Sequence, residues 1–454
     1  MDAATAHTSD AATKQLAEDL DRLPLGRTHL LVITICALGL VFDGLEMTIS
    51  TVFATIFTPK QGVPPGQLAI LISGAVAGAA IGGPLFGVLA DRLGRRIALA
   101  AALASFGLLS IVCGLAPDFN ALTVARFFTC FAIGAYHPLT MTYMVDVLPK
   151  HLRGRFMLLA AIFIGLGSAT PMFLTRWFNE LGVFGGEGWR ATLFVGGAGG
   201  VAVALLAWAM LPESPIWLLS RGRTEEASRA FARFARGRFA GSKPAPAPAA
   251  AAIVTSVAPE KPSLFRSPYL AATVLFFAIE FLTPWAISLV TMTGAMFARR
   301  GYDQNTSLMF SGVSVLFGPV GYFIASFVVD RFSRWAAVSV SGLLLGVLAL
   351  TFFFAKDATG AVVVAGMFNM LIGPFMVTLM IWGTELFPTS IRARASTLAF
   401  ACNRLGSLIV PPIALPLLHK QGELPPMAII AVVQIAIVLA IITYGRRLKV
   451  VAAA

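Results

Sequence analysis

Charged residues are scarce in this chain. Lys, Arg, Asp and Glu make up 12% of its 454 residues, whereas about 25% is usual in a soluble domain. Hydrophobic residues make up 57%, which is more apolar surface than a soluble fold of this length can bury. The composition therefore excludes an ordinary soluble protein and predicts that the chain lies in a lipid bilayer.

The chain also lacks the residue clusters on which enzymes and metalloproteins depend. Its five histidines are scattered, and its cysteines fall inside apolar runs without paired spacing: Cys36, Cys113, Cys130 and Cys402. This pattern predicts neither a disulfide framework nor a metal site. No nucleophile–base pair or phosphate-binding loop is recognisable, so we expect no enzyme and no cofactor. The net charge of +12 comes from short basic clusters between apolar runs, so we expect no nucleic acid partner.

What the chain does contain is a succession of long apolar runs. A helix needs roughly 20 apolar residues to cross a membrane, and twelve runs of this kind are present. They fall near 29–57, 67–90, 96–116, 120–146, 156–177, 190–211, 268–297, 306–330, 336–355, 361–385, 394–418 and 426–445. We therefore predict an all-α integral membrane protein with twelve transmembrane helices.

Basic residues in the loops predict the orientation. The side that holds both termini carries Arg92, Arg95, Arg96, Lys150, Arg153, Arg155, Arg331, Arg334, Arg392, Arg394, Arg446, Arg447 and Lys449. The opposite side offers few basic residues, such as Lys60, Arg299, Arg300, Lys356 and Lys420. By the positive-inside rule both termini are cytoplasmic, and compact loops favour a bacterial inner (plasma) membrane.

The spans divide the chain into five parts. They are an N-terminal tail (1–28), a six-helix bundle (29–211), a cytoplasmic linker (212–267), a second six-helix bundle (268–445) and a C-terminal tail (446–454). The linker contains a basic amphipathic segment from Thr224 to Arg238, which we expect to lie on the inner leaflet through Ala227, Ala230, Phe231 and Phe234. A Pro/Ala-rich stretch follows it and is typical of a disordered linker.

Short motifs occur twice in the chain, at one common offset of 239 residues. After the second span, Asp91, Arg92 and Arg95 recur as Asp330, Arg331 and Arg334 (330 − 91 = 239). After the fourth span, Asp146, Pro149, Arg153 and Arg155 recur as Glu385, Pro388, Arg392 and Arg394 (385 − 146 = 239). Gly167-Ser168 likewise recurs as Gly406-Ser407. The two bundles are therefore predicted to be parallel repeats with a substrate site between them near the midplane.

These motifs carry a family resemblance. The segment from Gly83 to Arg96 resembles the signature loop of the major facilitator superfamily, and Arg126 with Gly134 resembles its fourth-helix motif. The segment from Pro212 to Leu218 resembles the end of the sixth helix in the sugar, organic-ion and aromatic-acid branches. The resemblance implies a transporter that works by alternating access.

The signature loops are predicted to control that conformational change. Gly83 and Gly87 allow the second span to pack closely against a neighbour, and Asp91 can form charge-assisted hydrogen bonds with an adjacent helix end. Contacts made in one state and broken in the other bias the equilibrium. The residues expected to act in gating are Gly83, Gly87, Asp91, Arg92, Gly94, Arg95, Arg126, Asp146, Arg153, Asp330, Arg331, Arg334, Glu385 and Arg392. The alternative is that the arginines only anchor the topology.

Ionisable residues within spans are costly and so are candidates for function. Asp43 and Glu46 share one face of the first span. Desolvation of a carboxyl there makes it a plausible reversible proton carrier, and Glu280 is the third candidate for proton coupling. The alternative for Asp43 is a permanent ion pair with Arg126, which is itself expected to pair with the first span rather than to contact a ligand.

Arg404 lies near the midplane of the eleventh span. A guanidinium there can bind a substrate carboxylate with two hydrogen bonds, whereas its alternative role is to pair with Glu280 or Asn369. Further substrate-binding candidates are Tyr136, His137, Trp285, Asn369 and Trp382. For the histidine the alternative is a hydrogen-bonded structural residue, and for the aromatic residues it is packing.

Three segments resemble the aromatic-acid:proton symporter branch and the related niacin-type transporters. They are Asp43-Gly44-Leu45-Glu46, the stretch from Glu385 to Arg392, and Arg404-Leu405-Gly406. The fourth span departs from the branch, because Ala135-Tyr136-His137-Pro138 stands where relatives often have Gly-Glu-x-Pro. The resemblance implies that Asp43 and Glu46 serve proton coupling and that Arg404 binds the substrate carboxylate.

The expected function is proton-coupled uptake of a small organic, in particular aromatic, carboxylate by a single chain in the bilayer, with the proton as coupling ion. The alternatives are a sugar or polyol:proton symporter and a proton-coupled drug or metabolite exporter. The paired glutamines of sugar porters are absent from the seventh span, and the Gly-Pro-x-x-Gly-Gly stretch of antiporters is absent from the fifth.

Overall fold

The computed structural model describes Leu16 and residues 19–57, 62–236, 264–328, 333–387 and 389–445. A few side chains within these ranges, between 150 and 161, at 326 and 328, between 389 and 393 and at 445, fall outside the description. The Pro/Ala-rich stretch and both terminal tails, apart from a few residues of the N-terminal one, also lie outside the described residues.

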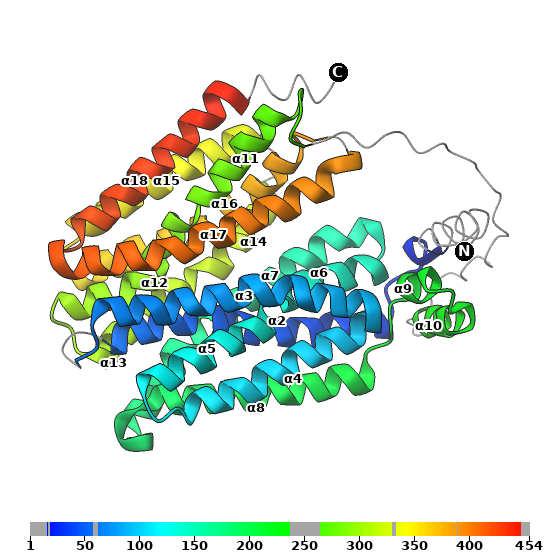
Figure 1. Ribbon diagram of the computed structural model, residues 1–454, viewed down its shortest axis with the longest axis horizontal. Coiled ribbons are helices and arrows are strands. Elements are labelled where there is room, and N and C mark those ends of the chain that lie inside the picture. The colour runs from blue at the N-terminus through cyan, green and yellow to red at the C-terminus, as the bar shows by residue number, and fades with distance from the viewer. Residues whose placement is uncertain are drawn as a thin grey trace.

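All the described elements are helices, arranged in two bundles of long rods (Figure 1). The first bundle contains α2 (Arg27–Ile56), α3 (Pro65–Leu93), α4 (Arg95–Gly114), α5 (Phe119–Ile133), α6 (Tyr136–Val147), α7 (Lys150–Glu180) and α8 (Gly188–Met210). Two short helices follow, α9 (Pro215–Ser220) and α10 (Thr224–Arg236). The second bundle contains α11 (Leu270–Leu282), α12 (Pro284–Arg299), α13 (Gln304–Val315), α14 (Phe317–Val328), α15 (Arg334–Phe354), α16 (Ala358–Thr384), α17 (Thr389–Gln421) and α18 (Leu424–Ala440). We call the bundles the N half and the C half.

Within the described residues, eleven of these helices or collinear helix pairs are long and apolar enough to cross a membrane. Three of the eleven are pairs, α5 with α6, α11 with α12, and α13 with α14. The long helix α7, which packs between α2 and α8, completes the twelve spans. The fold class predicted from hydropathy is therefore confirmed.

Proline explains the breaks inside the paired spans. Proline has no N–H for the carbonyl four residues before it, and its ring crowds that carbonyl. Pro138, Pro284 and Pro319 each lie just after or within four residues of the junction between the two helices of a pair. The break before Pro284 leaves the Glu280 carbonyl without its helical partner, and the Asn403 side chain of α17 donates to it at 3.2 Å.

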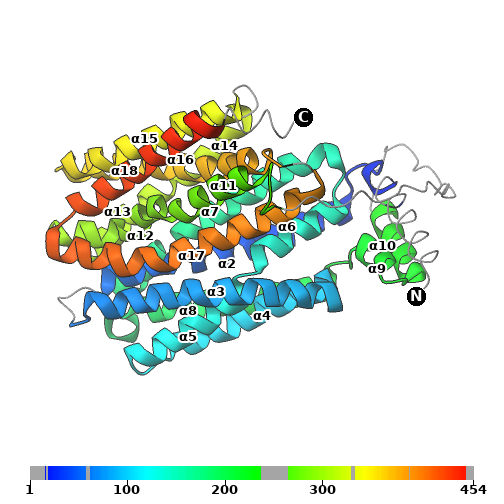
Figure 2. The same ribbon diagram turned by 45° about the horizontal axis from the view of Figure 1, so that its top comes forward.

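The two ends of the bundle differ, as Figure 2 shows. Helices α9 and α10 lie at the end from which α2 starts and at which α8 finishes. We call this the linker end and the opposite one the far end. In Figure 1 the two halves run close together at the far end and diverge toward the linker end.

Contacts between the halves concentrate away from the linker end. Helix α3 packs on α17, α2 on α12, and α7 on α13 and α14. The Ser73 hydroxyl donates to the Leu408 carbonyl at 3.0 Å, and at the far end the Asn179 amide donates to Asn305 at 2.9 Å. The halves are thus hydrogen-bonded to each other in the part of the membrane remote from α9 and α10.

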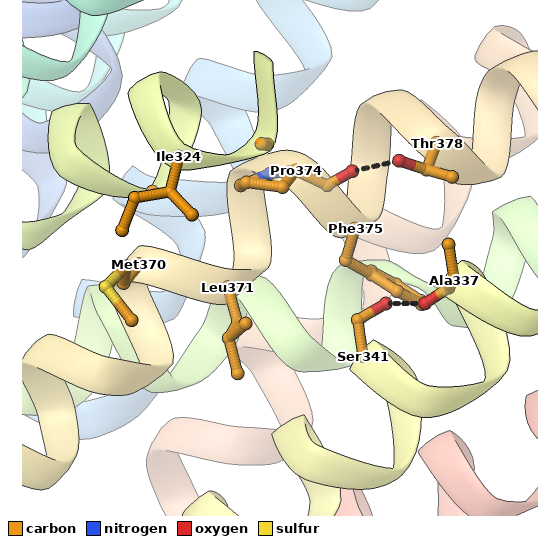
Figure 3. Close-up of a pocket in the computed structure, with 10 residues that line it drawn as sticks. Ile324, Ala337, Ser341, Met370, Leu371, Pro374, Phe375 and Thr378 are labelled. Carbon is orange, nitrogen blue, oxygen red and sulfur yellow. Dashed lines mark hydrogen bonds between the residues drawn. The ribbon is translucent and has the colours of Figure 1, made fainter. Parts of the chain in front are cut away.

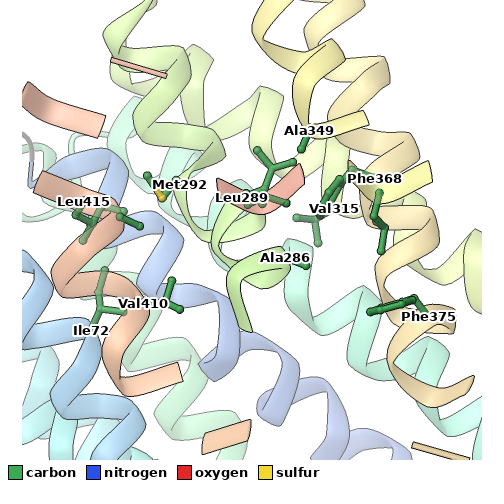
Figure 4. Packing of buried hydrophobic residues seen from close by; sticks show 14 of the residues in the cluster. Ile72, Ala286, Leu289, Met292, Val315, Ala349, Phe368, Phe375, Val410 and Leu415 are labelled. Carbon is green, nitrogen blue, oxygen red and sulfur yellow. The ribbon is translucent and has the colours of Figure 1, made fainter. Parts of the chain in front are cut away.

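Apolar packing fills the interior of both halves and the seam between them (Figure 4). Small residues allow close helix contacts, although not where we predicted them. An added Cβ at Gly78 or Gly82 of α3 would lie 2.1 or 1.9 Å from a carbonyl oxygen of α5, whereas nothing lies within 4 Å of such an atom at Gly87. At Gly83 the nearest atom is at an ordinary 3.6 Å. The predicted close packing through Gly83 and Gly87 is therefore wrong for this structure.

The amphipathic helix α10 packs on protein rather than on a leaflet. Its apolar residues Ala227, Ala230 and Phe234 are buried against α9 and the linker end of α2. The Thr28 hydroxyl donates to the Arg233 carbonyl at 3.0 Å, and the Arg233 guanidinium donates to the Met210 carbonyl at the end of α8. The expected membrane-facing role of this face is thus replaced by docking onto the N half.

Candidate functional site

Asp43 is a buried carboxyl without a hydrogen bond. It lies near the middle of α2, is 1% exposed, and neither carboxyl oxygen has a hydrogen-bond partner or contact with solvent. Its nearest charged or chargeable neighbour is His137, whose Nδ1 lies 3.5 Å from Asp43 Oδ2. A carboxylate in this setting is costly unless a proton or a cation neutralises it.

Glu46, one turn further along α2, has a different environment. Its Oε1 accepts a hydrogen bond from the Arg126 guanidinium of α5, and both side chains are almost fully buried. The Cys130 thiol donates to the same oxygen at 3.2 Å. The Arg126 guanidinium also lies over the Phe53 ring at 5.6 Å. Arg126 thus pairs with the first span, as expected, but through Glu46 and not through Asp43.

His137 and Tyr136 begin α6, directly after the break in the fourth span. The Tyr136 side chain is 1% exposed and packs against Gly39 of α2, where a Cβ would collide with its ring and hydroxyl. The His137 side chain, in contrast, is 45% exposed. Tyr136 therefore fixes the start of α6 against α2, while His137 joins the buried Asp43 to accessible space.

Arg404 is the cation that the C half contributes at mid-membrane. It is half-buried near the middle of α17, and its guanidinium lies 4.9 Å from the centroid of the Phe400 ring, one turn earlier. No carboxylate among the described residues lies within ion-pairing distance of it, and the Asp43 carboxyl of the N half is the acidic group whose field reaches it. An unpaired guanidinium stacked on an aromatic ring can bind a carboxylate.

Glu280 of α11 does not pair with Arg404. Its Oε2 accepts a hydrogen bond from the Asn403 amide at 3.1 Å, and the side chain is almost fully buried. The alternative in which Glu280 or Asn369 is the partner of Arg404 is therefore wrong, since the Asn369 amide donates to Ala365 within its own helix.

The remaining aromatic candidates lie in packed surroundings. Trp382 is 2% exposed and belongs to the main core cluster, and Trp285 packs against that cluster. Both side chains thus contribute to packing, and their role as substrate-binding residues stays a prediction.

At the linker end of the N half, the signature loop is tied to the turn after α8. Arg95 lies 2.7 Å from Asp91 and 3.7 Å from Asp146. The Ser214 hydroxyl donates to Asp146 at 2.9 Å, and the Trp217 indole donates to the Asp91 carbonyl. These contacts bring the predicted gating residues together.

Glu213 completes this network at the start of α4. Its carboxylate accepts hydrogen bonds from the backbone N–H groups of Arg95, Arg96 and Ser214, an arrangement that suits the positive end of a helix. Burial raises the pKa of Glu213, although these three donors oppose the rise. Gly94 before them has φ 109°, and an added Cβ would lie 2.3 Å from Glu213, so only glycine fits.

The C half repeats the central ion pair of this network. Arg334 lies 3.8 Å from Glu385, which reproduces the Arg95–Asp146 contact at the predicted offset. Arg92 is exposed. Asp330 and Arg331 lie outside the described residues, as do the side chains of Arg153 and Arg392, so their gating roles stay predictions.

An apolar crevice lies between α14, α15 and α16 (Figure 3). Its two hydroxyl groups are both used within their own helices, because Ser341 donates to Ala337 and Thr378 to Pro374. None of the described residues that line it is charged. It therefore does not suit a charged substrate, and the polar residues at mid-membrane are the better candidate site.

Sequence analysis missed three contributors to this site. Asn403 accompanies Glu280, Cys130 accompanies Glu46, and Phe400 accompanies Arg404. The spacing of Phe400 and Arg404, four residues apart on one helix, was a usable signal. The other two contacts join different helices, and nothing in the sequence specifies that register.

Comparison with known proteins assigns the family. Residues 40–446 match the sequence profile of the family described as "Sugar (and other) transporter". The chain belongs to this family of the major facilitator superfamily. It is therefore a multi-span membrane transporter rather than an enzyme, as predicted.

Curated relatives match most of the chain, and a solved structure shares its fold. The niacin transporter NiaP of Acinetobacter baylyi is 24% identical, covering 96% of this chain and 99% of the relative. A gallate transporter of Pseudomonas putida is 26% identical, covering 90% and 92%. A partially occluded inward open structure of the xylose transporter XylE from Escherichia coli has a TM-score of 0.72 at 16% identity, covering 92% and 97%. This last similarity concerns the fold alone.

Proposed function

We propose that this transporter is a proton-coupled symporter that imports a small aromatic carboxylate. The observation that carries the proposal is the placement of a carboxyl and a guanidinium at mid-membrane, one on each half. The Asp43 oxygens of the N half have no hydrogen-bond partner, and the Arg404 guanidinium of the C half has no ion pair among the described residues. One suits a proton and the other an anion. Because they belong to different halves, both are affected when the halves rock.

The coupling follows from the charges of these two groups. In the empty carrier, the Asp43 carboxylate is the acidic group that acts on Arg404. A substrate carboxylate bound at Arg404 takes over that role, so that Asp43 is left without a cation and gains a proton more readily. Anion and proton therefore load together, and the loaded carrier has the neutral pair that isomerises.

Two observations support an aromatic substrate. The Phe400 ring beside the Arg404 guanidinium offers a face on which another ring can stack. Two relatives are named for niacin and gallate, and both of these compounds are aromatic carboxylic acids.

The orientation predicted from loop charges places the linker end in the cytoplasm. The inter-half hydrogen bonds then lie on the extracellular side, and the structure corresponds to a carrier closed toward the outside. The chain works as a single copy in a bacterial inner membrane, with the proton as coupling ion and no other cofactor.

A sugar symporter is the second candidate, because the family description includes sugars and the fold resembles XylE. A neutral sugar has no carboxylate that could pair with the positively charged Arg404 guanidinium. The exporter alternative has no observation of its own in favour.

The test is uptake of labelled nicotinate or hydroxybenzoate into proteoliposomes, with and without an imposed pH gradient. Wild type is compared with Asp43→Asn and Arg404→Ala. Matched controls are Glu180→Gln and Arg229→Ala, whose side chains are largely exposed. We expect gradient-driven uptake that both site variants abolish and both controls preserve.

Three results would contradict the proposal. Uptake that does not depend on the pH gradient would refute the proton coupling. Uptake of xylose in place of the aromatic acids would favour the sugar alternative, and proton movement on addition of a neutral or cationic compound would favour the exporter.

A further inference from the structure

The Asp43–His137 pair connects a sealed group to an accessible one. Both Asp43 oxygens are closed to solvent, whereas the neighbouring imidazole is 45% exposed, and 3.5 Å separates Asp43 Oδ2 from His137 Nδ1. The imidazole therefore has free surface in this state, whereas the carboxyl has none. A proton on Asp43 needs an intermediary to leave the carrier in this state.

We propose that His137 is that intermediary and carries the coupling proton between Asp43 and water at the linker end. This inference rests on the proposed function and adds a residue to it. It moves His137 from the substrate-binding role expected from the sequence to a role in proton transfer.

The transfer is balanced in two steps. Protonated Asp43 donates its proton to the unprotonated Nδ1 of neutral His137, which leaves a carboxylate beside an imidazolium. The imidazolium then gives one proton to water at its exposed edge and becomes neutral again. A short thermal movement that closes the 3.5 Å separation to hydrogen-bonding distance is sufficient, since transfer requires about 2.6–3.2 Å.

The surrounding charges favour this path. The groups around the pair are Tyr136 on α6 and Arg404 on α17, with the Cys36 and Cys130 thiols beside them. Glu46, one turn further along α2, is paired with Arg126 of α5, and the Tyr136 side chain is buried against α2. Among the described residues, Arg404 is therefore the cation near Asp43 that has no ion pair, and it favours departure of the proton once the substrate has left.

The local backbone holds the imidazole in position. His137 lies in the first turn of α6, after the interruption that Pro138 causes in the fourth span. Buried Tyr136 fastens that turn to α2, so that the imidazole is held at Asp43 without its ring being enclosed.

Two measurements test the inference, and the first needs no substrate. A hydrophobic carbodiimide modifies protonated buried carboxyls, and mass spectrometry resolves the modification at Asp43. Removal of a nearby cation favours the neutral carboxyl. The pH of half-labelling is therefore expected to rise by about one unit in His137→Gln, with His419→Gln as the matched control.

The second measurement compares pH-driven net uptake with substrate exchange in proteoliposomes of His137→Ala. Exchange needs no proton release, so the ratio of net uptake to exchange should fall at least about tenfold. Added imidazole should restore the ratio, because the exposed site admits it. A merely structural role would not respond to imidazole.

The outcomes separate the inference from the proposed function. Wild type without pH-driven uptake would refute the symport, while the labelling profile would still decide whether His137 controls the proton on Asp43. An unchanged labelling profile, or net uptake and exchange that fall together without imidazole rescue, would overturn the relay alone.

Discussion

The two halves share a scaffold but not their mid-membrane charges. Residues 239 positions after Asp43, Glu46 and Arg126 are Leu282, Trp285 and Ala365. The N half thus holds a buried ion pair and an unsatisfied carboxyl, whereas the C half holds an amide-bonded Glu280 and the unpaired Arg404. The two bundles are thus alike in their helices but differ in the ionisable residues that they hold at mid-membrane.

At the linker end, in contrast, the two halves carry corresponding charged residues. There the Arg95–Asp146 contact at 3.7 Å has its counterpart in Arg334–Glu385 at 3.8 Å. In the N half, this pair is further tied to Asp91, Glu213 and Ser214. The ion pair that couples helix ends is therefore retained in both halves.

The largest expected effect concerns the buried pair of the N half. Arg126→Ala leaves Glu46 as an uncompensated buried charge, which costs about 3–5 kcal/mol. We expect a large fall in the unfolding temperature of the purified protein. Glu280→Ala in the C half should destabilise far less, because its partner is a neutral amide.

The double variant Glu46→Ala/Arg126→Ala is the control for this prediction. It removes both charges, so it should recover part of the lost stability. Equal destabilisation by Arg126→Ala and Glu280→Ala would contradict the contrast between the halves.

The next effect concerns anion binding by the C half. Arg404→Ala removes a charge-assisted hydrogen bond worth about 1.5–3 kcal/mol, so the apparent affinity should fall about 10- to 100-fold. The affinity of Arg404→Lys should lie between those of wild type and Arg404→Ala. An ammonium keeps the positive charge but cannot form two parallel hydrogen bonds with a carboxylate. Binding isotherms with nicotinate measure this, and affinity unchanged in both variants would exclude Arg404 from the site.

Gating contacts should show a smaller difference between the halves. Arg95→Ala disrupts contacts with two carboxylates and should slow transport about tenfold. Arg334→Ala disrupts a more exposed pair and should slow it less than about fivefold. Initial uptake rates compare the two, with exposed Arg223→Ala as control. A larger effect at Arg334 would reverse our view of which network dominates.

The smallest effect is expected at the far end. Asn305→Ala removes one inter-half hydrogen bond, which is worth about 1 kcal/mol and shifts the equilibrium about fivefold toward opening at this end. Spin labels at Leu181 and Leu424, both exposed, report the distance between the halves. Gln67→Ala is the control, and an unchanged distance distribution in Asn305→Ala would show that this contact does not hold the far end closed.

Much of the fold was predictable because lipid imposes length and apolarity on each span. The positions of the helix breaks could not be predicted, because a proline in a span does not always interrupt the helix. Pro84, Pro171 and Pro374 remain inside continuous helices, whereas Pro138 and Pro284 adjoin breaks. At the break before Pro284, the Asn403 amide of α17 satisfies the released Glu280 carbonyl, and the sequence does not specify that contact.

The sequence predicts which residues form the candidate site, but not which of them pair with each other. Ionisable residues are rare within spans, so Asp43 and Arg404 stand out in the sequence. Which of two acids one turn apart meets Arg126 depends on the rotation of α2 against α5, and periodicity does not specify it. The structure selects Glu46 for the pair and leaves Asp43 open.

The division of labour between Asp43 and Arg404 is tested most directly by the ratio of pH-driven net uptake to substrate exchange. Asp43→Asn should lower this ratio at least about tenfold, because exchange needs the anion site but no proton transfer. Arg404→Ala should lower net uptake and exchange together. A variant at Asp43 that keeps the wild-type ratio, or a variant at Arg404 that keeps full exchange, would contradict the assignment of the proton to the N half and the anion to the C half.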